Sequence, residues 1–223
     1  MHPQYIQHNV AAGDTKEGIL SILPFIPKTG RISTIRIFQD GDYVFTHNLY
    51  NISAPAKVVF DVYRFEDGKV VEHWDNIQTL ETTPNPAGRT MLDGTIQPTQ
   101  LTLAQTAANK ALVKSYIRDV LMGGNIEKLP EYFHEDQFIQ HAPGALDGPV
   151  GFNGSEQTYN RIRMVLGDGN FVLAMGEGTA AGVPTAFYNL YRVENGKLAE
   201  HWNVIESILP RDQWNPTNNN GRF

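Results

Sequence analysis

A histidine and an aspartate lie two positions apart in the segment VVEHWDNI, residues 70–77. If this segment is a strand, its side chains alternate between two faces, so His73 and Asp75 share a face with Val71 and Ile77. An apolar environment raises the pKa of a carboxyl group, and a neighbouring imidazolium lowers it again. A pair of this kind can exchange protons with a small molecule near neutral pH.

Two other segments carry polar and aromatic residues that could join this pair. DYVFTH is typical of a strand in which Tyr43, Phe45 and His47 share a face, and YIQHN is a short segment near the N-terminus. The predicted catalytic residues are Asp75, His73, His47 and His8. The predicted substrate-binding residues are Gln7, Asn9, Tyr43, Phe45 and Tyr63.

Each of these residues also has a purely structural interpretation. A strand histidine beside an aspartate is often a hydrogen-bonded pair at a surface or a sheet edge. Trp74 and Trp202 are more typical of packing residues than of ligand platforms. The chain has seven histidines but no HxH or HExxH pattern, so we expect no metal site.

The sequence contains an internal repeat. Residues 60–77 align with residues 188–205, and 9 of the 18 aligned pairs are identical. QYIQH also matches QFIQH, and GDYVF matches GNFVL, in the same order along the chain. Three matching blocks in one order predict two copies of one domain.

The two copies differ where ionisable residues lie. Asp75 aligns with Asn203, and His47 aligns with Met175. We therefore predict that the first copy keeps the chemistry, whereas drift of a surface residue is the alternative. The second-copy equivalents, which we expect to be inactive, are Gln140, His141, His201 and Asn203.

Each copy is a short strand ending in Gln-His, then a helix, then strands joined by hairpins. We predict helices from Thr15 to about Leu23 and from Ser155 to about Leu166, with Thr15 and Ser155 as N-caps. EDG and ENG predict tight hairpin turns. Helices followed by hairpins indicate two α+β domains with mostly antiparallel sheets.

The second copy begins with a segment that the first copy lacks. Apolar residues recur with helical spacing in LAQTAANKALVKSYIRDVLMGGN, which ends at two glycines, and IEKLPEYF predicts a short helix after it. The leading helices of the first copy are absent from this sequence, so we expect a longer natural chain; the alternative is packing supplied by another subunit. The predicted boundaries are 1–81 for the first domain, 82–101 for a linker rich in Pro, Gly and Thr, and 102–223 for the second domain.

Composition limits the classes of function. The chain has 223 residues, of which 41% are hydrophobic and 19% charged, as in soluble globular proteins. A net charge of −6 and the lack of a Lys/Arg-rich run argue against a nucleic-acid partner. No apolar run is long enough for a membrane span, and the N-terminus does not read as a signal peptide. We therefore expect a cytoplasmic protein, subject to residues that precede Met1 in a longer natural chain.

The segments YIQHN, GDYVFTHN and VYRFEDGKVVEHWDNIQ resemble the SnoaL-like polyketide cyclase family of the nuclear transport factor two-like superfamily. NPAGRTML is similar to the end of a subgroup named for aldol condensation. The resemblance covers both copies apart from the linker. It implies cone-shaped domains in which a curved sheet and helices enclose an apolar pocket. It also implies catalysis without a cofactor, with the family's aspartate at Asp75, its Gln-His at Gln7 and His8, and a strand histidine at His47.

We therefore expect a cofactor-independent acid–base enzyme that acts on a small apolar carbonyl compound by aldol-type cyclisation, retro-aldol cleavage or isomerisation. Asp75 would move a proton next to the carbonyl, and a histidine would donate to the developing enolate oxygen. The alternatives are a hydrolase or dehydratase that uses the same pair, and a non-catalytic ligand-binding or assembly scaffold. Two fused copies also indicate a pseudo-dimer of the repeats, or a homodimer.

Overall fold

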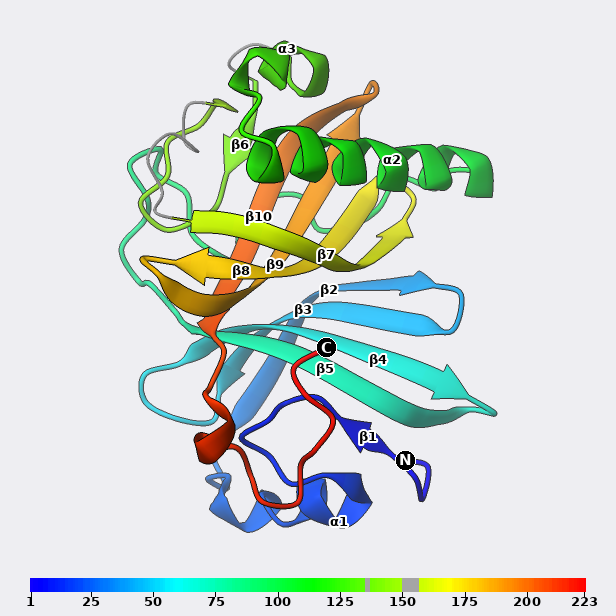
Figure 1. Cartoon of the computed structure of the whole chain (residues 1–223), viewed down its shortest axis with the longest axis vertical. Helices are drawn as coiled ribbons and strands as arrows, with labels where there is room; N and C mark the ends of the chain where they lie inside the picture. Colours follow the sequence, from blue (N-terminus) through cyan, green and yellow to red (C-terminus); the bar gives the residue numbers. More distant parts are fainter. Residues whose placement is uncertain (135–136, 150–156) are drawn as a thin grey trace. The chain divides into compact units, whose positions relative to one another are not determined.

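The residues described by the computed structural model are 1–134, 137–149 and 157–223 (Figure 1). The chain forms two compact units. The first comprises Met1–Leu80 and Ile208–Phe223, and the second comprises Glu81–Ser207. Each unit contains a five-stranded sheet with helical segments, which confirms the predicted α+β class. Within the described ranges, no helix has the length and apolar character needed to cross a bilayer.

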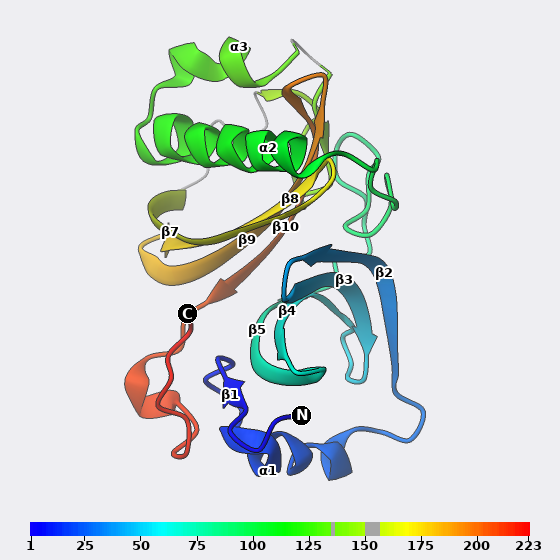
Figure 2. The ribbon, with the colours of Figure 1, turned by 90° about the vertical axis from the view of Figure 1, so that its right-hand side faces the viewer.

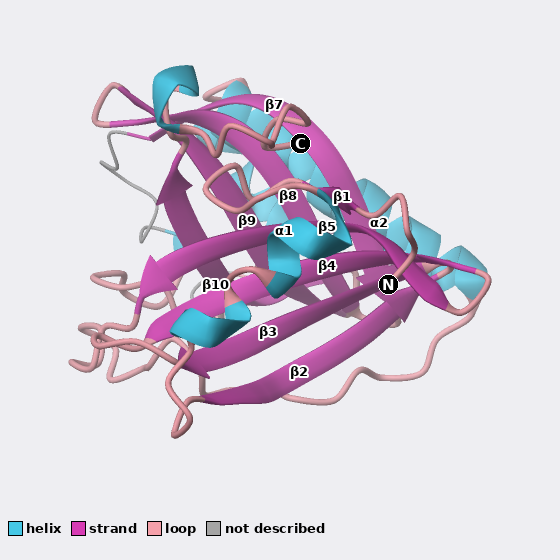
Figure 3. Ribbon diagram, turned by 90° about the horizontal axis from the view of Figure 1, so that it is seen from below, coloured by secondary structure: helices cyan, strands magenta, loops and turns pink. Residues whose placement is uncertain are grey.

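The sheet of the first unit is curved, and its long strands lie side by side (Figures 2 and 3). Its strands, in sheet order, are β1 (Ile6–Gln7), β5 (Lys69–Thr79), β4 (Lys57–Glu66), β3 (Tyr43–Asn51) and β2 (Arg31–Asp40). β1 runs parallel to β5, and the other neighbours are antiparallel. Asp67 and Gly68 join β4 to β5 with φ angles of 48° and 72°, as the EDG turn predicts.

The sheet of the second unit has the same strand order. Its strands are β6 (Ile139–Gln140), β10 (Lys197–Ser207), β9 (Val183–Glu194), β8 (Phe171–Ala180) and β7 (Gln157–Asp168). β6 is parallel to β10, and His201 is in register with Gln140 just as His73 is with Gln7. The shared order and register agree with the repeat in the sequence.

Helices cover one face of the second sheet (Figure 2). They are α2 (Leu103–Tyr116), the π-helical turn η2 (Ile117–Met122), the 3₁₀ turn η3 (Ile126–Lys128) and α3 (Leu129–Tyr132). Thr102 and Gln105 form a capping box at the start of α2, and Gly124, with φ of 70°, follows η2. The predicted apolar stripe is buried: Tyr116 and Ile117 belong to the core cluster beneath these helices.

The helical part of the first unit is smaller. It consists of α1 (Thr15–Leu20) and the 3₁₀ turns η1 (Leu23–Phe25) and η5 (Arg211–Gln213). The prediction of Thr15 as N-cap is wrong, because Asp14 precedes the helix and Thr15 has a φ of 68°. α1 buries no side chain, and no helix precedes β1 among the described residues.

The predicted helix from Ser155 to Leu166 is wrong. Ser155 and Glu156 lie outside the described residues, and residues 157–166 fall in β7, which pairs with β8. Two register shifts interrupt the alternation of β7, between Tyr159 and Arg161 and between Ile162 and Met164. Such bulges break the two-residue period, and the resulting apolar spacing resembled that of a helix.

The predicted domain boundaries need two corrections. Residues 81–101 are part of the second unit, where the amide of Asn85 donates to the carbonyl of Gln140 at 2.8 Å. Residues 208–223 are part of the first unit, where the amide of Asn218 donates to the carbonyl of Gln7 at 3.0 Å. Each unit is thus completed by the segment that follows the other unit's last strand, because these asparagines satisfy backbone carbonyls there.

Candidate functional site

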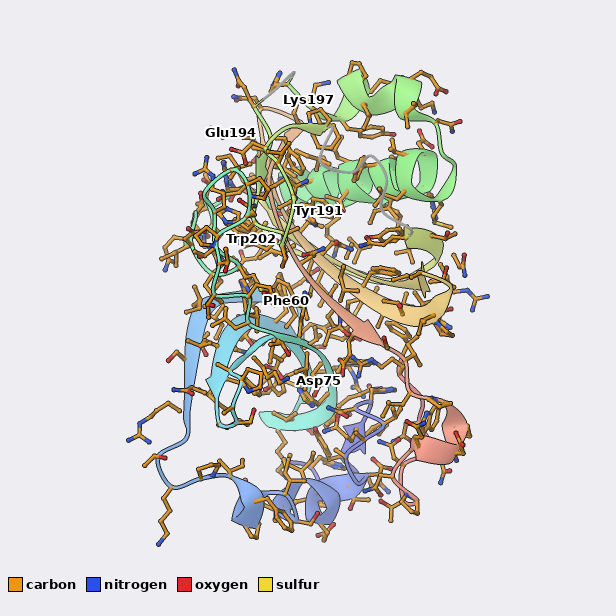
Figure 4. The ribbon with its side chains drawn as sticks, turned by 90° about the vertical axis from the view of Figure 1, so that its left-hand side faces the viewer. Phe60, Asp75, Tyr191, Glu194, Lys197 and Trp202 are labelled. Atoms are coloured by element: carbon orange, nitrogen blue, oxygen red, sulfur yellow. The ribbon has the colours of Figure 1, made fainter. Side chains whose placement is uncertain are left out.

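A polar network lies on one face of the first unit's sheet, which we call the inner face. The register places Asp61 opposite Asp75 and Tyr63 opposite His73, so strand alternation directs all four side chains to this face. Phe60 belongs to the other face; Figure 4 shows Asp75 and Phe60 on opposite sides of the sheet.

Asp61 is the centre of the network and is 1% exposed. Its Oδ2 accepts hydrogen bonds from Asn48 Nδ2 at 2.7 Å and from the Tyr50 hydroxyl at 2.8 Å. Its Oδ1 lies 2.9 Å from His73 Nε2. The carboxylate therefore has three partners, and buried carboxylates need such partners to remain charged.

The hydrogen bonds around His73 define its protonation. Nδ1 lies 3.1 Å from Gln7 Oε1, which also accepts from the backbone N–H of Asn9 at 2.9 Å. That oxygen is therefore an acceptor, and Nδ1 carries a proton. Nε2 faces a carboxylate oxygen of Asp61, so it needs a proton as well. His73 is held as an imidazolium.

The electrostatics agree with this geometry. Burial would lower the pKa of His73, but the hydrogen bond and charge of Asp61, followed by the charge of Asp75, raise that pKa above its ordinary value. The charge of Arg222 acts in the opposite direction. The two carboxylates prevail, so His73 remains protonated to higher pH than a free histidine.

Asp75 lies beside this pair and is 7% exposed. Its Oδ2 accepts from Asn9 Nδ2 at 2.8 Å, and its Oδ1 lies 3.5 Å from a guanidinium nitrogen of Arg222. Neither contact involves the imidazole of His73. Asp75 can therefore accept a proton from a bound molecule without disrupting the Asp61–His73 pair.

Three phenols line the same region. Burial, with the charges of Asp61 and Asp75, raises the pKa of Tyr5, Tyr50 and Tyr63 far above the ordinary value. These hydroxyls therefore stay protonated and can act as hydrogen-bond donors. The ring of Tyr63 is stacked on the imidazole of His73 with centroids 4.6 Å apart.

A metal ion does not suit this donor set. Ligand atoms of Asp61, His73 and Asp75 lie within 4.8 Å of one another, which is close enough to surround a cation. However, Asp61 Oδ1 and His73 Nε2 are hydrogen-bonded to each other at 2.9 Å, which leaves no space between them for an ion. The imidazolium has no lone pair to offer, and Arg222 adds a further positive charge.

The structure removes three predicted residues from the site: His47, Tyr43 and Phe45 lie on the other face. His47 is in register with Phe60, stacks on that ring at 4.4 Å and bonds Arg36 at 3.0 Å. The prediction correctly placed Tyr43, Phe45 and His47 on one face of β3, but it assigned that face to the wrong side of the sheet. On β3, it is the alternate set containing Asn48 that reaches the inner face.

His8 is also outside the site. Its Nε2 lies 2.8 Å from Glu72 Oε1, and its ring stacks on Trp74 at 4.8 Å, both on the outer side of β5. His141 repeats this arrangement in the second unit, with Glu200 at 2.9 Å and Trp202 at 4.7 Å. A pair present in both units is structural.

Three of the residues predicted to bind substrate lie next to the site. Gln7, Asn9 and Tyr63 contact the histidine or the aspartate of the site. The site residues that the sequence prediction missed are Tyr5, Asn48, Tyr50, Asp61 and Arg222. Alternation within β4 could have revealed Asp61, which is two residues before Tyr63. No local pattern could have revealed Arg222, which is 147 residues from Asp75.

The equivalent network in the second unit is uncharged. Asn189 replaces Asp61 and lies 2.9 Å from His201 Nε2, while Gln140 lies 2.8 Å from Nδ1. Burial, followed by the charge of His141, lowers the pKa of His201 to about 3. Asn203 replaces Asp75, and its Oδ1 has no hydrogen-bond partner among the described residues.

Comparisons with known proteins return structures but no families. No family model matches the chain, and no curated sequence matches it. IdmH from Streptomyces antibioticus, a candidate polyketide cyclase, is 19% identical, with a TM-score of 0.35; the match covers 44% of this chain and 91% of that one.

Two further structures are similar over about half of the chain. A candidate ketosteroid isomerase from Kribbella flavida DSM 17836 is 14% identical, with a TM-score of 0.40, over 48% of this chain and 83% of that one. An LEH-like epoxide hydrolase from M. tuberculosis is 13% identical, with a TM-score of 0.37, over 45% and 84%.

Proposed function

We propose that the first unit is a cofactor-independent acid–base enzyme that moves a proton next to the carbonyl group of a small, largely apolar molecule. The observation that supports this is the pair of carboxylates around a protonated histidine on one sheet face. In the second unit both carboxylates are replaced, by Asn189 and Asn203. Loss of both charges in one copy indicates that they act as a set in the other.

Each group has a distinct part in this reaction. Asp75 takes the proton from the carbon next to the carbonyl, and the electron pair of the broken C–H bond moves into an enolate. The positive charge of His73, maintained by Asp61, stabilises the enolate oxygen, and the phenol of Tyr63 can donate a hydrogen bond to it. Return of the proton to another carbon gives isomerisation, and attack of the enolate on a second carbonyl gives aldol closure.

The first experiment is proton exchange in heavy water, followed by NMR. Cyclic ketones, lactones and aromatic polyketide-like compounds are first screened for thermal stabilisation, and binders are tested for exchange of the proton next to the carbonyl, with EDTA present. We expect Asp75→Asn to lower the exchange rate more than about 100-fold, the usual range for loss of an acid–base group.

The control is Asp42→Asn, which removes an exposed carboxylate from the β2–β3 turn. It should exchange like the wild type. Equal exchange by Asp75→Asn and the wild type would remove Asp75 from the mechanism. Equal binding by both proteins without any conversion would instead favour a non-catalytic ligand carrier.

The second carboxylate favours one alternative reaction, which is hydrolysis or dehydration. With Asp61 keeping His73 charged, Asp75 could activate a water molecule while the positive charge of the imidazolium stabilises the leaving oxygen. Turnover in ¹⁸O-labelled water separates hydrolysis from proton transfer and from dehydration, since only hydrolysis places the label in the product.

A further inference from the structure

The C-terminal segment of the chain places a buried cation beside β5, where it contacts Asp75 on the inner face and Asn76, whose side chain belongs to the other face. Arg222 is 7% exposed, and its guanidinium lies 3.5 Å from Asp75 Oδ1 and 2.6 Å from Asn76 Oδ1. Asn218, four residues earlier, is fully buried and donates to the carbonyls of Gln7 and Asn9. The segment is therefore fastened to the loop whose side chains contact His73 and Asp75.

The second unit has an equivalent segment, residues 90–91, that lacks the arginine. His8 Nδ1 lies 3.0 Å from the carbonyl of Gly221, and His141 Nδ1 lies 2.9 Å from the carbonyl of Thr90. These carbonyls occupy equivalent places, and the next residue is Arg222 in one unit and Met91 in the other. The unit that contains the carboxylate of Asp75 has an arginine at this place, and the unit that contains Asn203 has a methionine.

We propose that Arg222 is a positioning residue of the first unit's site, which holds the carboxylate of Asp75 toward the inner face and balances the charges there. Its effect on turnover rests on the proposed function, whereas its effect on His73 does not. Without Arg222, Asp75 keeps one described donor, Asn9, and would be free to rotate away from a bound molecule.

The charges around His73 make this inference measurable. The charges of Asp61, Asp75 and Arg222 act on the imidazole, and the ring of Tyr63 stacks on it. The Tyr5 and Tyr50 hydroxyls are hydrogen-bonded to its partners Gln7 and Asp61. The two carboxylates raise the pKa of His73, and Arg222 lowers it. Removal of the guanidinium should therefore move the NMR titration of the His73 imidazole to higher pH.

The test compares Arg222→Met, which copies the second unit, with Arg222→Lys. We expect Arg222→Met to raise the titration midpoint of His73 and to lower kcat about 10- to 100-fold with a smaller change in KM, the range for a misplaced catalytic group. Arg222→Lys should stay closer to the wild type in both measurements. Arg31→Met, which removes an exposed arginine from β2 of the same unit, is the control and should change neither.

A folded Arg222→Met variant with an unchanged His73 midpoint would overturn the inference. If Arg222→Met does not fold, Arg222→Gln, which removes the charge but keeps a polar side chain, decides in combination with Asp75→Asn: Arg222→Gln should raise the His73 midpoint more when Asp75 is present than in the Asp75→Asn background. Equal effects in both backgrounds would mean that Arg222 does not act through Asp75. The titration needs no substrate, so failure to find a reaction would not be mistaken for failure of this inference.

Discussion

His73 and His201 occupy equivalent strand positions, but the pKa of His73 is raised and that of His201 is lowered. Each has a glutamine at Nδ1, and the difference is the group at Nε2, which is Asp61 in one unit and Asn189 in the other. A carboxylate requires a proton on Nε2, whereas an amide offers either a donor or an acceptor. One carboxylate therefore decides whether burial leaves the histidine charged.

Asp61→Asn tests this at the level of one residue. The pKa of His73 should fall below its ordinary value, as that of His201 does, because burial then acts without the hydrogen bond that opposes it. The measurement is the NMR titration of the imidazole. An unchanged midpoint would show that Asp61 does not hold the proton.

The same shift has a consequence for stability. A histidine whose pKa is raised in the folded state stabilises the protein below the unfolded pKa of about 6.5, and this contribution is lost as pH rises through the folded value. His73 thus favours the folded state in mild acid. Asp61→Asn should reduce that advantage in chemical unfolding at pH 5 more than at pH 9.

At the level of elements, two asparagines hold the exchanged segments. Asn218 donates to the carbonyls of Gln7, Asn9 and Ala12, at 3.0, 2.9 and 3.1 Å. Asn85 does the same for Gln140 and Ala142, at 2.8 and 3.2 Å. These carbonyls belong to the last residues of β1 and β6 and to the loops that follow, so each asparagine fixes the loop beside its unit's polar network.

Asn218→Ala should lower the free energy of unfolding by about 1–3 kcal/mol, because buried carbonyls lose their donor. The pH-independent loss can be measured by chemical denaturation, with Asn219→Ala, an exposed neighbour, as the control. Turnover should also fall, since Asn9 is held by the same loop. A variant as stable as the wild type would show that the segment is not fastened by Asn218.

For the whole molecule, the chemistry is expected in one unit. His201 Nε2 lies 2.9 Å from the amide oxygen of Asn189, and its pKa of about 3 leaves it neutral across the pH range in which enzymes commonly act. His201→Gln should therefore change turnover less than about twofold, whereas His73→Gln should remove most of it. Equal losses in both variants would contradict the division between an active and an inactive copy.

The loss of folding stability at acid pH should come from the second unit. His201 is neutral when folded and binds a proton when unfolded, so stability declines as pH falls from about 6.5 toward about 3. His201→Gln should flatten this decline in unfolding experiments monitored across that range. The pH dependence of unfolding would thus distinguish His201 from His73 without the need for a substrate.

Much of the organisation follows from local patterns. Repeated blocks predicted two copies, β-rich segments with DG and NG turns predicted the hairpins, and alternation within β5 placed His73 beside Asp75. These features depend on residues close together in the chain, where the two-residue period and turn chemistry determine geometry. The contrast between Asp75 and Asn203 was likewise visible in the sequence.

Only the tertiary structure decided which strands' side chains meet. Register between β3 and β4 sent His47 to the outer face and brought Asn48 to Asp61, because a shift of one residue exchanges the two faces. The bulges of β7 interrupt its two-residue alternation, so this strand was predicted as a helix. Arg222 reached Asp75 from the far end of the chain, through segments that exchange between the two units. Such contacts depend on the path of the whole chain, which no local period encodes.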